Sequence, residues 1–153
     1  MNKLLICVTL GASLVLTACG EPVERMATTP SGRPEAIFRG RTQGQVATRL
    51  ASHCLERGLM VDEHTDNRVV CRGRLEGGAA FAAQLLIGNS YSTPPEGILT
   101  FSFVQQGRDV RAYGRGEVVT QMAYGQIRRV ESNGNADFNS LMQAMITVGG
   151  EAP

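Results

Sequence analysis

Two long runs of alternating residues constrain the fold of this chain more than any other feature. Apolar and polar side chains alternate over residues 98–105 and again from Val110 to about Met122. A period of two is typical of strands that bury one face, and Gln106-Gly107-Arg108 between the runs has the composition of a turn. The sequence therefore predicts a long antiparallel hairpin. One face of its second strand carries small residues, which leaves room for a helix backbone to pack closely.

Two shorter runs, residues 59–64 and 68–75, predict a second hairpin. Its register depends on the length of the loop, because a shift of one residue moves every side chain to the other face. A two-residue loop would pair Val61 with Arg72 and mix polar with apolar faces. A three-residue loop would pair Val61 with Cys71 and keep the apolar residues together, so we expect the three-residue loop.

Helices are predicted at both ends of the folded region. Residues 42–57 carry apolar side chains at helical spacing, and Thr42-x-x-Gln45 has the form of a capping box. Gly58 suits the position just after the last turn. Apolar residues three and four apart predict a last helix from about Asp137 to Val148. Strand character also resumes around residues 126–130.

The order of these elements predicts an α+β domain. We expect one antiparallel sheet of about five strands, with an N-terminal and a C-terminal helix on one face and the other face partly open. This layout resembles helix-grip modules, a likeness of arrangement that implies no function. Residues 79–87 leave two alternatives, since alternation and flanking glycines favour a strand whereas the alanines suit a short helix.

The N-terminus has the pattern of an export signal. Lys3 precedes an uncharged, mostly apolar run from Leu4 to Leu16, which is shorter than the roughly 20 residues that span a bilayer. The run ends in Leu16-Thr17-Ala18-Cys19, which resembles the lipobox of bacterial lipoproteins. The resemblance implies cleavage after Ala18, acylation of Cys19 and anchorage in a membrane by acyl chains. An ordinary secretory signal that happens to contain a cysteine is the alternative.

The residue after Cys19 is Gly20. In many Gram-negative bacteria an Asp at this position retains a lipoprotein in the inner membrane, so the resemblance implies the outer membrane, with the domain facing the periplasm. We accordingly divide the chain into a signal peptide at 1–18, a lipidated flexible tether at 19–38 and a single α+β domain at 39–150. The tether is inferred from its turn-forming composition and lack of periodicity.

The charge balance excludes one class of partner. Lys and Arg together number 15, Asp and Glu number 14, and the only lysine, Lys3, leaves with the signal peptide. The remaining side-chain charges sum to zero, whereas nucleic-acid-binding domains carry a clear basic excess. We therefore expect no nucleic-acid partner. The sequence also has no polybasic stretch that would reinforce membrane binding.

Two cysteines, Cys54 and Cys71, remain after Cys7 is discarded and Cys19 is acylated. An even pair in an oxidising compartment predicts a disulfide. It would close a loop of about 17 residues and contribute on the order of 3 kcal/mol of stability. The alternatives are a Cys54 nucleophile assisted by a nearby histidine, or a metal site.

The candidate partner-binding face consists of four arginines and a tyrosine on the predicted strands: Arg72, Arg74, Arg111, Tyr113 and Arg115. Their positions allow them to share one face, and Arg and Tyr are both enriched at interaction hot spots. The face could also receive a polyanion such as lipopolysaccharide, or peptide carboxylates. The remaining alternative is a solvated face on which the arginines are interspersed with Glu76 and Glu117.

Residues for catalysis or metal binding are few. Asp62 and His64 would share one face of their strand, but two ligands do not make a metal site, and the sequence has neither a serine-nucleophile motif nor a phosphate loop. We expect no cofactor, no metal and no enzymatic activity. The leading hypothesis is a lipid-anchored accessory module that binds a protein partner within an envelope or secretion assembly. Alternatives are a carrier of small ligands or lipids between helices and sheet, and a mobile-element exclusion or immunity lipoprotein.

Overall fold

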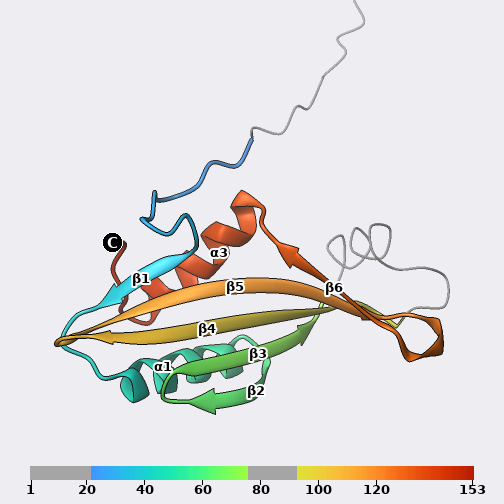
Figure 1. Cartoon of the computed structure of the whole chain (residues 1–153), viewed down its shortest axis with the longest axis horizontal. Coiled ribbons are helices and arrows are strands. Elements are labelled where there is room, and N and C mark those ends of the chain that lie inside the picture. The colour runs from blue at the N-terminus through green and yellow to red at the C-terminus, as the bar shows by residue number, and fades with distance from the viewer. Residues whose placement is uncertain (1–21, 76–92) are drawn as a thin grey trace, which may run out of the picture.

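The computed structural model describes residues 22–75 and 93–153, and the elements within these ranges are drawn in Figure 1. Along the chain they are β1 (Glu35–Phe38), α1 (Gln43–Glu56), β2 (Met60–Thr65), β3 (Arg68–Arg74), β4 (Glu96–Gln106), β5 (Asp109–Gln121), the 3-10 turn η1 (Ala123–Gly125), β6 (Ile127–Ser132) and α3 (Asn135–Thr147). The signal peptide, Cys19 and residues 79–87, for which the sequence favours a strand, lie outside the described residues.

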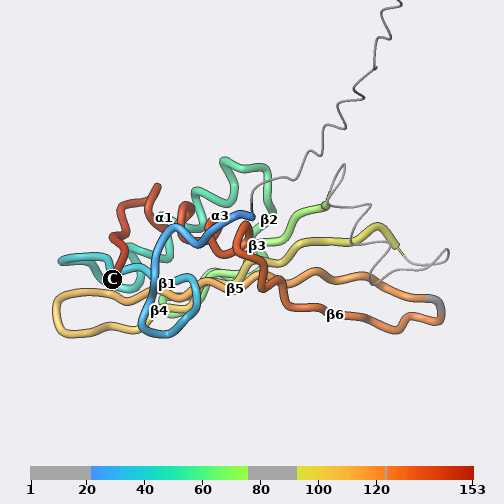
Figure 2. Tube along the Cα trace, turned by 90° about the horizontal axis from the view of Figure 1, so that it is seen from above, coloured from blue at the N-terminus to red at the C-terminus, as the bar shows by residue number. Residues whose placement is uncertain are grey.

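The strands form one antiparallel sheet of six strands, in the order β1-β5-β4-β3-β2, with β6 also paired to β5. The α+β class and the antiparallel sheet are therefore confirmed. β1 pairs with residues 110–113 of β5 and β6 pairs with residues 116–121, so the two strands share one edge of β5 end to end. The β5–β6 hairpin extends beyond the part of the sheet that lies next to the helices (Figure 2).

The first helix, α1, has the ends that the sequence predicts. The Thr42 hydroxyl accepts a hydrogen bond from the Gln45 backbone N–H, and the Gln45 side chain accepts one from the Thr42 backbone N–H. This reciprocal capping box satisfies two donors that the first turn leaves free. Gly58 follows the last turn with a φ of +75°, a conformation that glycine adopts without steric cost.

The β2–β3 hairpin has the predicted pairing of Val61 with Cys71 but a different loop. Thr65 pairs with Arg68, so the turn between them has two residues instead of the expected three. The register then shifts by one residue between Val61 and Glu63. This β-bulge at Asp62 restores the apolar pairing that the short turn would otherwise have displaced.

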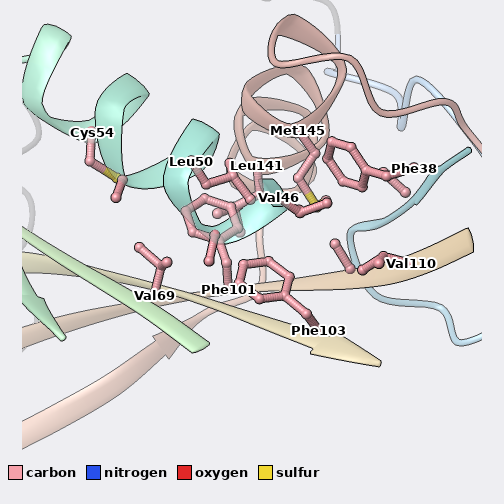
Figure 3. Close-up of a cluster of buried hydrophobic side chains, with 14 of the residues drawn as sticks. Phe38, Val46, Leu50, Cys54, Val69, Phe101, Phe103, Val110, Leu141 and Met145 are labelled. Carbon is pink, nitrogen blue, oxygen red and sulfur yellow. The ribbon is translucent and has the colours of Figure 1, made fainter. Parts of the chain in front are cut away.

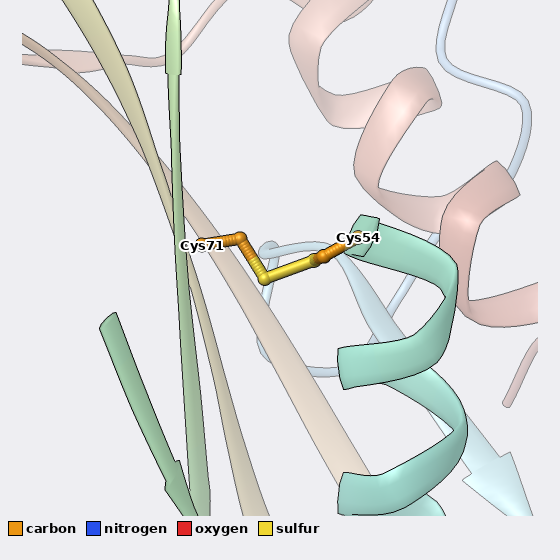
Figure 4. The surroundings of a disulfide bond; sticks show 2 residues. All are labelled: Cys54 and Cys71. Atoms are coloured by element: carbon orange, nitrogen blue, oxygen red, sulfur yellow. A yellow bond between two sulfur atoms is a disulfide. The ribbon is translucent and has the colours of Figure 1, made fainter. Parts of the chain in front are cut away.

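The predicted disulfide between Cys54 and Cys71 is confirmed and joins α1 to β3 (Figure 4). Their Cα atoms lie 6.3 Å apart, and the two residues are separated by 17 positions in the sequence. Both cysteines are almost fully buried. The bond therefore fastens the helix to the sheet from inside the core.

One hydrophobic core contains side chains from both helices and from the strands β1, β3, β4 and β5 (Figure 3). Leu50 from α1, Met145 from α3 and Phe101 from β4 are each almost fully buried in it. α3 approaches β5 closely, because a Cβ atom added at Gly114 would lie 3.2 Å from the Cβ of Leu141. The small residues predicted along one face of β5 therefore do accommodate a helix.

The expectation of a flexible tether up to residue 38 is wrong for its C-terminal part. β1 belongs to the sheet, and its residues Ala36 and Phe38 are buried in the core. The backbones of Ile37 and Glu151 also exchange two hydrogen bonds, which ties the strand to the C-terminal end of the chain. A strand of four residues is too short for its alternation to stand out beside the turn-forming residues that precede it.

Candidate functional site

The register of the sheet brings the five predicted residues to one face. Phe101 pairs with Gly114, and their side of the sheet faces the core. Because side chains alternate along a strand and paired residues point the same way, their neighbours point to the opposite face. We call this opposite side the polar face, and its residues include Arg72, Arg74, Glu96, Ile98, Arg111, Tyr113, Arg115, Glu117, Val119, Ile127, Arg129 and Glu131.

The first ion-pair group of the polar face is centred on Arg72. Its Nε donates to Oδ2 of Asp62 at 2.7 Å, and its Nη1 lies 3.7 Å from a carboxylate oxygen of Glu96. Asp62 reaches Arg72 because the bulge interrupts the alternation of β2, whereas His64 is paired with Val69. The expectation that Asp62 and His64 share a strand face is therefore wrong.

A second ion-pair group joins β5 to β6. Glu117 and Glu131 stand directly opposite each other across the two strands, an arrangement of like charges that is destabilising by itself. Arg115 lies 2.8 Å from Glu117 and 3.3 Å from Glu131, and Arg129 lies 3.5 Å from the second oxygen of Glu117. The two arginines thus neutralise the facing carboxylates. Both arginines are more than half exposed, so each contact contributes little stability.

Arg111 has a different role, because its partner is buried. Nη1 of Arg111 lies 2.8 Å from Oε1 of Glu35, whose side chain is 0% exposed, while Arg111 itself is 26% exposed. The backbone N–H and the hydroxyl of Ser31 donate to the other oxygen of Glu35. The loop before β1 therefore covers this carboxylate. The charge of Arg111 is therefore paired within its own chain and requires no external partner.

The polar face is hollowed where β3, β4, β5 and β6 meet. The depression measures about 540 Å³, and its lining includes Arg72, Arg74, Ile98, Val119, Ile127 and Arg129. Ile127 is 63% exposed although it is a large apolar residue. Arginines beside an exposed aliphatic side chain such as Ile127 can hold a carboxylate and an apolar group of a partner at the same time.

Sequence reasoning identified Arg72 and Arg74 but missed the β6 residues of this depression, Ile127 and Arg129. The available signal was the spacing of Ile127 and Arg129 two residues apart, on the same side of a predicted strand. What the sequence did not show is that β6 pairs beside the far half of β5. Only that pairing brings Arg129 near Glu117.

A separate exposed cluster fixes the connection between β1 and α1. Asp109 at the start of β5 accepts a hydrogen bond from the Gly40 backbone N–H at 2.9 Å and one from the Arg39 guanidinium at 2.7 Å. The Gly40 amide, and then Arg39, lower the pKa of Asp109 below its ordinary value of 3.8. The same contact with Asp109 raises the pKa of Arg39.

The described residues contain no cluster of three or more His, Cys, Asp and Glu side chains that could hold a metal ion. Cys54 is bonded to Cys71 and is not a free thiol. No helix among the described residues is long and apolar enough to cross a membrane. No protein-family model matches the sequence, and no characterised protein matches it significantly.

Proposed function

We propose that this chain is a lipid-anchored cell-envelope protein whose small domain binds a protein partner as an accessory module of an envelope or secretion assembly. The anchor is the lipobox cysteine Cys19, which follows a short apolar signal. Gly20 after it favours the outer membrane, with the domain in the periplasm. The disulfide is consistent with such an oxidising location, because disulfides persist outside the cytosol.

The proposed layout is helix-grip-like, with both helices on one face of the sheet. It is supported by the shared core of α1 and α3 and by the view in Figure 2, in which both helices lie above the strands. In this layout neither helix covers the polar face, which is therefore available to a partner. The face carries similar numbers of arginines and carboxylates, which suits a protein surface of mixed charge better than a polyanion.

The observation that carries the proposal is the depression of about 540 Å³ on the polar face. Exposed Ile127 and the arginines Arg74 and Arg129 at its rim combine an apolar contact with charged groups, as the residues of protein interfaces do. Among the described residues, the apolar cavity between α3 and the sheet measures about 140 Å³. Small-molecule sites typically measure about 300–1,000 Å³, so this cavity is small for a carrier that would hold its ligand between helix and sheet. We propose no enzymatic activity.

Two experiments test the two halves of this proposal. Cys19→Ser should block acylation and release the protein from the membrane fraction. An unchanged mass and unchanged fractionation would remove the anchor from the proposal.

For the partner, cells that produce the wild-type chain are treated with a mild cross-linker and compared with cells that produce Arg129→Glu or Arg108→Glu. Arg129 lines the depression, whereas Arg108 is exposed in the β4–β5 turn. We expect a specific cross-linked species that Arg129→Glu abolishes and Arg108→Glu leaves intact. A chain that remains monomeric in every sample, or equal effects of the two variants, would contradict the proposed binding face.

A further inference from the structure

We infer that the segment Val23–Met26 is locked onto α3 and holds the domain against the lipid surface, with the N-terminal half of α3 next to the membrane. This inference rests on the proposed acylation of Cys19. It replaces a domain that floats on a long tether with one that is held close to the bilayer. Two asparagines of α3 form hydrogen bonds with the N-terminal segment.

The two asparagines, Asn135 and Asn139, lie four residues apart and therefore on the same side of α3. The Asn139 amide group donates from Nδ2 to the carbonyl of Glu24 at 2.7 Å and accepts at Oδ1 from the backbone N–H of Met26 at 2.8 Å. One turn earlier, Nδ2 of Asn135 donates to the carbonyl of Val23 at 2.9 Å. The Asn139 amide thus both donates to and accepts from the peptide backbone, as a neighbouring strand would, and Asn135 adds one more backbone hydrogen bond.

Arg25, in the middle of the segment, adds three further contacts. Its Nε donates to Oδ1 of Asn135 at 3.1 Å, and its Nη1 donates to the carbonyl of Gly32 at 3.0 Å. Its guanidinium lies 4.6 Å from the centroid of the Phe138 ring, which is within the range of a cation–π contact. Since Phe138 belongs to the core, the segment is connected to the folded domain and not only to its surface.

The number of residues between the acylated Cys19 and Val23 limits how far the domain can move from the bilayer. Cys19 and Val23 are four positions apart, which a fully extended chain spans in at most about 14 Å. If Val23–Met26 were free, the next fixed residue would be Thr29, whose hydroxyl bonds to the carbonyl of Arg33. The ten positions from Cys19 to Thr29 would then span up to about 35 Å.

The exposed side chains of the segment fit a place at the lipid surface. Val23 is 55% exposed and Met26 is 47% exposed, and both lie within seven positions of the proposed acylated cysteine. Apolar side chains this close to the bilayer can enter the boundary between headgroups and acyl chains. Figure 1 draws the segment in blue where the grey trace ends, on the side of the molecule where α3 begins.

The experiment uses the full acylated chain with a fluorescent label attached at Asn133→Cys, an exposed position in the turn before α3. The protein is reconstituted in vesicles of phosphatidylethanolamine and phosphatidylglycerol that carry a headgroup quencher. We expect strong quenching, and a several-fold loss of quenching in Asn135→Ala/Asn139→Ala because the tether lengthens. Gln143→Ala, farther along the same helix, is the matched control and should quench like the parent chain.

Hydrogen exchange at the Met26 amide gives a second readout that does not depend on lipid. In detergent-solubilised full-length protein this N–H should be protected, and Asn139→Ala, which removes the Oδ1 atom that accepts it, should lower the protection several-fold. Equal quenching in the parent and the double variant, or an unprotected Met26 amide, would overturn the inference while the proposed function stands. If the chain with an intact Cys19 does not incorporate into vesicles at all, both the proposed function and the inference fail.

Discussion

Replacing Arg111 with Met removes the positive charge beside Glu35 while it keeps most of the aliphatic stem. The Glu35 carboxylate is fully buried, so it would be left in the protein without its counter-charge. Loss of one partner from a buried ion pair typically costs about 3–5 kcal/mol, because the remaining charge stays desolvated. The expected loss is therefore in folding stability and not primarily in partner binding.

Two features of the structure place this cost at the lower end of the range. The Arg111 side chain is 26% exposed, so water can approach the site when the guanidinium is gone. Ser31 also continues to donate two hydrogen bonds to Oε2 of Glu35. We expect Arg111→Met to lower the free energy of unfolding by about 3 kcal/mol, which corresponds to a fall of roughly 10 °C in Tm for a domain of this size.

Urea denaturation followed by circular dichroism measures this loss. Arg74→Met is the control: Arg74 is an exposed arginine that forms no ion pair among the described residues, and its stability should change by less than about 0.5 kcal/mol. Adding Glu35→Gln to Arg111→Met should recover part of the loss, because no unpaired charge then remains. Arg111→Met and Arg74→Met chains of equal stability would refute the reasoning.

Two further predictions concern the disulfide and the Asp109 cluster. Cys54→Ala/Cys71→Ala should lower the free energy of unfolding by about 3 kcal/mol in urea denaturation, because the unfolded chain loses a 17-residue loop constraint; an unchanged midpoint would show that the bond contributes nothing. The lowered pKa of Asp109 means that folding favours its charged form. Its contribution to the stability of the folded state is therefore present above pH 3.8 and is lost as the pH falls below that value. In thermal melts the Tm of the wild type should exceed that of Asp109→Asn at neutral pH, and this difference in Tm should shrink below pH 3.8. A difference in Tm that stays constant at acidic pH would contradict the assigned role of Gly40 and Arg39.

The sequence was sufficient to predict the helices and strands that have a repeating hydrophobic pattern or a capping motif. The capping box of α1 and the helix C-terminus at Gly58 depend on local chemistry, which a sequence displays directly. The disulfide follows from the parity of the cysteines together with the faces of α1 and β3. These features require no knowledge of distant parts of the chain.

The β2–β3 hairpin shows how a correct pairing can come from an incorrect premise. Burial of one face predicts the pairing of Val61 with Cys71, and the structure confirms that pairing. The loop length was wrong, because a bulge at Asp62 supplies the extra residue that the sequence argument assigned to the turn. Bulges leave no periodic signature in a strand of six residues, so hydrophobic pattern predicted the register but not the means of achieving it.

The sequence predicted the shared face of the arginines but not their partners, for a related reason. The alternation of β5 placed Arg111 and Arg115 on one face, but it did not reveal which carboxylates lie beside them. Glu35 comes from a strand of four residues in a segment that has the composition of a tether. Its contact with Arg111 arises from pairing between distant parts of the sequence, and local patterns carry no information about such a contact.

The position of β1 in the sheet has a consequence for the order in which the chain can fold. β1 lies near the start of the described chain, yet it pairs with β5 and exchanges backbone hydrogen bonds with Glu151, almost at the C-terminus. A ribosome, or a translocation channel that delivers the N-terminus first, releases β1 long before those partners. Contacts between residues so far apart in sequence slow folding, because a long loop must close before they are made. The first of the described strands to emerge is therefore among the last to be paired, and the sheet is completed only after β5 and Glu151 have followed.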